Sequence, residues 1–219
     1  MTHLDVEVQR LRDDMKEMFA LTCSQINKAR QSFLNIDKDL AREIIFYERR
    51  MNSIELKIDR DCENILALLN PVAIDLRFVL ACMKINSSLE RIADNAEGLA
   101  RYVNEIKQPF DDELIKKIGL VEMFSAAEQM LADVCAAFET ENAALAHAVF
   151  QKDERLNELN SKAATVTEEF IKTHLDKTYE SLFVLSAIRK MERVGDIAKN
   201  IAEEIIFYIE AKVLKHKKD

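Results

Sequence analysis

Two stretches of this chain, about one hundred residues apart, carry the same pattern of side chains. Residues 89–100 read LERIADNAEGLA, and residues 191–202 read MERVGDIAKNIA. The glutamate, the arginine, the aspartate and two alanines coincide, and the apolar residues at 89, 92 and 99 are replaced by other apolar residues in the second stretch. One copy lies in each half of the chain. The duplication predicts an internal structural repeat of about one hundred residues.

Apolar residues recur at three- and four-residue steps through both halves, which is typical of amphipathic helices. Pro71 and Pro109 interrupt the pattern, because the proline ring removes a backbone donor and disfavours helix at the preceding residue. Each half therefore predicts three long helices that bury their apolar stripes against one another. The predicted helices span residues 4–34, 38–69 and 72–106 in the first half and 112–138, 143–174 and 179–214 in the second.

We therefore expect an all-α fold of two pseudo-symmetric antiparallel three-helix bundles, with six long helices in total. The first repeat covers residues 1–108 and the second covers residues 109–219. The composition agrees, since 219 residues contain only three glycines and two prolines. Sandwiches and α/β folds use more of these residues in their many turns.

The net charge, the N-terminal residues and the lengths of the apolar runs argue against several classes of protein. The formal net charge is −8, whereas nucleic-acid binding needs a basic surface that displaces counterions from phosphates. We expect no nucleic-acid partner. The N-terminal residues lack the regions of a signal peptide, and no run of ~18 apolar residues is present to span a membrane. We therefore expect a cytoplasmic protein with no direct membrane span.

The repeated Glu-Arg-x-x-Asp unit places two carboxylates one helical turn apart. Glu90 and Asp94 fall on the same strip of their predicted helix, and Glu192 and Asp196 repeat this geometry. Such a pair can ligate a hard cation or bridge two of them. The alternative is a solvated helix face stabilised by i,i+4 charge pairs. Exposure to solvent alone does not require the same residues twice, although shared ancestry also preserves them.

The second helix of each half adds further oxygen side chains with the same spacing. Glu48 and Asn52 lie one turn apart in the first half, and Asp153 and Asn157 lie one turn apart in the second. Side chains on two adjacent helices can converge on one cation, although an ordinary polar face has the same pattern. We predict metal sites from these residues, with iron, zinc, manganese or magnesium as the metal. The predicted ligands are Glu90, Asp94, Glu192, Asp196, Glu48, Asn52, Asp153 and Asn157.

Several of these motifs resemble those of the PhoU family. Residues 70–77 read NPVAIDLR and precede SLERIAD at 88–94, in the order and at the distance found in the first half of that family. Residues 191–204, MERVGDIAKNIAEE, are similar to its second half. The resemblance covers nearly the whole chain. One departure is Gly98, which stands where the second copy has Asn200.

The resemblance implies both a fold and a function. It implies two three-helix bundles, Glu-x-x-x-Asp motifs that bind clusters of iron or other divalent metals, and repression of the phosphate-starvation response. Members of the family are thought to link the ATPase of the phosphate ABC transporter to a sensor histidine kinase. We expect the same adaptor role here, in a homodimer that is not an enzyme.

Three other functions compete with this hypothesis. PhoU-like domains also accompany sodium–phosphate cotransporters, so a regulatory subunit of such a carrier is one alternative. A carboxylate metal-cluster enzyme is another, although the chain lacks the Glu-x-x-His motifs of ferritin-like di-iron proteins. A plain helical scaffold without a bound metal is the third.

Overall fold

The computed structural model describes residues 2–214, and these residues form helices and short connections without a β-strand. Most of the helices are about thirty residues long, close to 45 Å at 1.5 Å per residue. The elements are α1 (His3–Asn35), α2 (Lys38–Leu69), α3 (Ala73–Glu105), α4 (Asp112–Ile118), α5 (Leu120–Thr140), α6 (Ala143–Thr173), a 3₁₀ turn η1 (Leu175–Lys177) and α7 (Thr178–Glu210).

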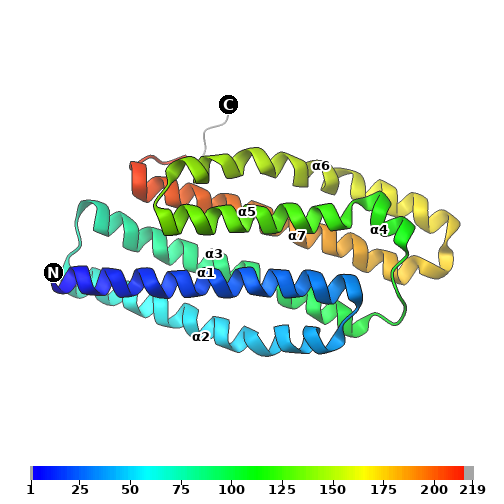
Figure 1. The fold of residues 1–219 in the computed structure, drawn as a ribbon, viewed down its shortest axis with the longest axis horizontal. Coiled ribbons are helices and arrows are strands. Elements are labelled where there is room, and N and C mark those ends of the chain that lie inside the picture. The colour runs from blue at the N-terminus through cyan, green and yellow to red at the C-terminus, as the bar shows by residue number, and fades with distance from the viewer. Residues whose placement is uncertain (1, 215–219) are drawn as a thin grey trace.

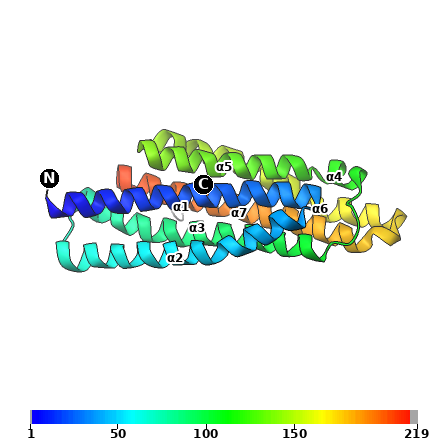
Figure 2. The same ribbon diagram turned by 60° about the horizontal axis from the view of Figure 1, so that its bottom comes forward.

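The helices form two three-helix bundles that lie side by side along their length (Figure 1). The first bundle consists of α1, α2 and α3, and the second consists of α4 with α5, α6 and α7. The predicted fold class is confirmed. Between the bundles, α1 packs on α5 and α3 packs on α7, as Figure 2 also shows. Within residues 2–214, no helix is both long and apolar enough to cross a bilayer.

Side-chain caps fix several helix starts where the sequence places them. Asp37 accepts backbone hydrogen bonds from Asp39 and Leu40 at the start of α2, both at 3.0 Å. Asn142 caps α6 in the same way, through the backbone N–H groups of residues 144 and 145. Such caps satisfy N–H groups that have no partner within the helix. They confirm the predicted boundaries before the second and fifth long helices.

The predicted helix over residues 112–138 is wrong in one respect, because Gly119 divides it into α4 and α5. Gly119 has a φ of +72°, in the left-handed region that favours glycine. A Cβ at this position would lie 2.8 Å from Cδ2 of Leu159, so packing also requires glycine. The last helix also ends earlier than predicted, at Glu210 rather than 214, because Ala211 adopts a left-handed conformation with a φ of 56°.

One hydrophobic core runs through both bundles. The ring of Phe138 in α5 lies 5.1 Å from that of Phe19 in α1 and 6.0 Å from that of Phe78 in α3. Tyr208 of α7 contacts Phe78 at 5.5 Å. Burial of aromatic rings across this boundary removes large apolar areas from water. The shared core fixes α3 beside α7, and these two helices carry the duplicated motif.

Candidate functional site

The duplicated motif lies on the polar faces of α3 and α7, as its helical spacing predicts. Ile92 and Val194, inside the two motifs, are fully buried. Glu90 and Glu192 are half-buried, whereas Asp94 and Asp196 are exposed. The buried apolar residues therefore anchor each helix and leave both carboxylates on its polar face.

In the first bundle, acidic side chains of α2 face those of α3. Asn52 donates a hydrogen bond to Oε1 of Glu48, so these two residues form one unit on α2. Burial, then the neighbouring charge of Asp94, raises the pKa of Glu90 to about 7, and Glu55 and Glu48 contribute to the rise. Burial also raises the pKa of Asp94, again with a contribution from Glu48. Negative charge is thus concentrated where α2 faces α3.

Glu55 also belongs to this group, although it is not among the ligands predicted from the sequence. Its pKa is raised by burial and by the charges of Asp59 and Asp94. A signal was present in the sequence, because Glu55 lies seven residues after Glu48 and therefore on the same strip of the helix. We define the first carboxylate set as Glu48, Asn52, Glu55, Glu90 and Asp94.

In the second bundle, the structure brings the equivalent residues together around Asp153. Asp153 is only 5% exposed, and its Oδ2 accepts hydrogen bonds from Asn157 at 3.1 Å and from Nζ of Lys199 at 2.8 Å. Burial raises the pKa values of Glu192 and Asp196, and the charge of Asp153 raises them further. We define the second carboxylate set as Asp153, Asn157, Glu192 and Asp196.

The two sets differ in their internal charge balance. Lys199 supplies an ammonium group to the second set through its ion pair with Asp153. The equivalent position of the first copy is Glu97, which adds a negative charge and pairs with Arg101 at 2.6 Å. The second set therefore contains its own cation. Among the described residues, no carboxylate of the first set has such an ion pair, and Arg91 and Lys190 only partly offset the neighbouring acidic charges.

Carboxylate and amide oxygens are ligands suited to hard divalent cations, so the donor chemistry of the first set fits such an ion. In the described conformation, however, no three His, Cys, Asp or Glu side chains of residues 2–214 are close enough together to hold a metal ion. The side chains of Glu90 and Asp94 would have to turn toward Glu48 to share one ion.

Comparison of the chain with models of protein families tests the resemblance to the PhoU family. The model described as "PhoU domain" matches residues 15–103 and matches again over residues 120–205. The chain belongs to the PhoU family. Each match contains one copy of the Glu-Arg-x-x-Asp motif, so the duplication recognised in the sequence is a duplication of the PhoU domain.

Similar proteins share this fold over nearly the full chain. A PhoU homolog 1 of Thermotoga maritima, named as a phosphate-specific transport system accessory protein, is 27% identical over 97% of this chain and 91% of its own length. The PhoU protein of Escherichia coli is also 27% identical, over 97% of this chain and 87% of its own length.

Solved PhoU structures agree with this architecture. The crystal structure of PhoU from Pseudomonas aeruginosa is 28% identical, with a TM-score of 0.86 over 96% of this chain and all of that chain. A phosphate transport system regulatory protein PhoU from Streptococcus pneumoniae has a TM-score of 0.84 at 27% identity, over 97% of this chain and all of that chain.

Proposed function

We propose that this PhoU-family chain is an accessory protein of a phosphate-specific transport system and represses the phosphate-starvation response. The observation that carries the proposal is the similarity to accessory proteins of that system over 97% of the chain. A match of this extent includes both bundles, so it supports a role of the whole chain rather than of one domain.

The proposed mechanism is that of an adaptor. In the cytoplasm, the chain, as a homodimer, contacts the ATPase of the phosphate ABC transporter and a sensor histidine kinase, and it catalyses no reaction. The rigid double bundle supports this role, because its long exposed helix faces offer two partners separate surfaces. A shared core between the bundles would transmit a displacement at one surface to the other.

We further propose that the first carboxylate set binds a divalent or trivalent metal ion. Glu48, Glu90 and Asp94 would hold the ion, which would supply positive charge and cross-link α2 to α3. The raised pKa of Glu90 supports this, because burial and the acidic groups Asp94, Glu55 and Glu48 raise it by more than the charge of Arg91 lowers it. In the second set, Lys199 already supplies one positive charge, so we expect weaker metal binding there.

A genetic experiment tests the adaptor role. The gene is deleted in its host, and alkaline phosphatase is measured under phosphate-rich conditions before and after complementation. We expect derepression in the deletion strain and restored repression with the parent chain. Unchanged repression in the deletion strain would overturn the proposal. Co-purification of a sodium–phosphate carrier instead of the transporter ATPase would assign the chain to that carrier.

Elemental analysis tests the metal proposal separately. Protein purified without an affinity tag or chelator is compared with Glu90→Gln/Asp94→Asn and with the matched second-set variant Glu192→Gln/Asp196→Asn. We expect iron, manganese, zinc or magnesium in the parent, most of it lost in the first variant and retained in the second. Absence of metal from the folded parent would refute this part of the proposal.

A further inference from the structure

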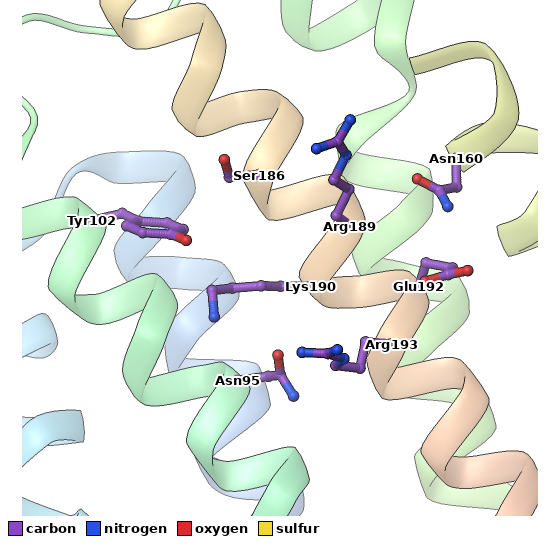
Figure 3. A pocket seen from close by; sticks show the side chains of 8 residues that line it. All are labelled: Asn95, Tyr102, Asn160, Ser186, Arg189, Lys190, Glu192 and Arg193. Carbon is purple, nitrogen blue, oxygen red and sulfur yellow. The ribbon is translucent and has the colours of Figure 1, made fainter. Parts of the chain in front are cut away.

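A cleft lies along the seam between the two bundles, on the side where α3 meets α7 (Figure 3). It has a volume of about 510 Å³, within the size range of pockets that take small-molecule ligands. Ser186, Arg189, Lys190 and Arg193 line it from α7, with Glu192 beside them. The opposite wall carries Asn95 and Tyr102 of α3, and Asn160 of α6 lies at one end.

Three cations of α7 dominate the cleft. Arg189, Lys190 and Arg193 lie within five residues of α7, and Figure 3 shows Lys190 and Arg193 pointing toward α3 while Arg189 extends away from them along α7. In the described part of the chain, none of the three has a carboxylate within ion-pair distance. Like charges at i and i+4, such as Arg189 and Arg193, destabilise a helix. A bound anion would relieve this repulsion.

The nearby carboxylates do not neutralise this group. Among residues 2–214, Glu192 is the one acidic side chain that lines the cleft. An adjoining hollow shares Lys190 and Arg193 and adds Asp94 and Glu97, but also the cation Arg91. Glu97 is already paired with Arg101. The cations that line the cleft therefore outnumber its acidic side chains.

The backbone of α3 is adapted to this lysine. Gly98 faces Lys190, and a Cβ at position 98 would lie 2.4 Å from its Nζ and 2.8 Å from its Cε. Nζ also lies 5.5 Å from the ring centroid of Tyr102, within range of a cation–π contact. Glycine is unfavourable within a helix. Here it leaves room for the ammonium group, and the second repeat has Asn200 instead.

We propose that this cleft binds a small phosphorylated anion, with its phosphoryl oxygens held by Lys190 and Arg193 and with Arg189 adding positive charge at the edge of the cleft. Arginine offers paired N–H groups that match two oxygens of a phosphoryl group, and lysine adds a compact positive charge. The volume exceeds that of a phosphate ion, so the site has room for free phosphate or for the phosphoryl group of a small organic molecule. The ligand bridges the two repeats and holds α3 against α7.

Calorimetry with chelator-treated protein tests the proposal and separates it from the proposed metal site. Inorganic phosphate, ADP and adenosine are titrated into the full chain in chloride buffer containing EDTA. Binding of phosphate or ADP, but not adenosine, is expected, and the tighter of the two identifies the source of the phosphoryl group. No binding of either at about 10 mM, where even weak millimolar sites fill, would overturn the proposal. Binding that needs added divalent metal would also overturn it.

Two variants locate the site. Lys190→Gln removes one charge-assisted hydrogen bond and is expected to weaken binding about tenfold. Gly98→Ala keeps every charge but displaces the end of Lys190, and it is expected to weaken binding severalfold in a chain that stays folded. The control Arg60→Gln removes an exposed charge on α2 and should change affinity less than about twofold. Affinity unchanged in both cleft variants, or lowered equally by the control, would refute the assignment.

Discussion

Replacement of Glu90 by glutamine is the most direct test of the charge imbalance in the first carboxylate set. Burial and the neighbouring acidic groups raise the pKa of Glu90 from 4.5 to about 7. The folded chain therefore holds this proton more tightly than the unfolded chain. Stability from this group is full below about pH 4.5 and is lost as pH rises through about 7, because the native state binds more protons in that window.

The size of the effect follows from the same values. A change from 4.5 to about 7 corresponds to about 3.4 kcal/mol at 1.36 kcal/mol per pH unit. Glu90 is only half-buried, so solvent screening reduces this to about 1 kcal/mol. Glu90→Gln has no charge to desolvate. We expect the variant to be about 1 kcal/mol more stable than the parent at pH 8, and equally stable at pH 4.5.

Urea unfolding in EDTA, at several pH values between 4.5 and 8, measures this difference. The control is Glu154→Gln, an exposed glutamate of α6 outside both carboxylate sets, which should follow the parent at every pH. Parallel pH profiles for the parent and Glu90→Gln would refute the reasoning. A variant less stable than the parent at pH 8 would also refute it, because the glutamate would then have a stabilising partner.

Two further perturbations address the second set and the shared core. Lys199→Gln leaves the buried carboxylate of Asp153 without its cation, so we expect a loss of about 1.5–3 kcal/mol in urea unfolding, partly restored by adding Asp153→Asn. A loss no larger than that of Lys162→Gln, at an exposed position of the same bundle, would contradict the ion pair. Phe138→Ala is expected to cost about 3–5 kcal/mol and to lower the unfolding midpoint of both bundles together. Two separate transitions by circular dichroism and near-ultraviolet absorbance would show instead that the bundles unfold independently.

Helical periodicity and capping residues predict most of this fold from the sequence. Asp37 and Asn142 place helix starts correctly because their effect is local. Gly119 was not recognised as a break, because the apolar pattern continues through Leu120 and Met123 without interruption. Gly119 also packs against Leu159, which lies forty residues away, and local sequence does not predict this contact. The end of α7 at Ala211 could not be predicted, because no glycine or proline is present there to mark it.

In the carboxylate sets too, spacing along one helix could be predicted from the sequence, whereas contacts between helices could not. The spacing on one helix was sufficient to pair Glu90 with Asp94. Glu55 was missed, because its relevance depends on how α2 is rotated against α3. The role of Lys199 also follows from a contact between helices, since its partner Asp153 lies 46 positions away. The cleft around Lys190 is formed by residues of both repeats, so no single sequence motif predicts it.

The aromatic contacts between the bundles have a consequence for synthesis on the ribosome. Phe19 and Phe78 pack against Phe138 and Tyr208, which are translated long after the first bundle is complete. At about 5–20 residues per second, the missing residues take about 5–20 s to appear. During that interval the nascent first bundle exposes the apolar face that later packs against the second bundle. A neighbouring nascent chain exposes the same surface, so a chaperone that covers this face until the second bundle emerges would prevent pairing between chains.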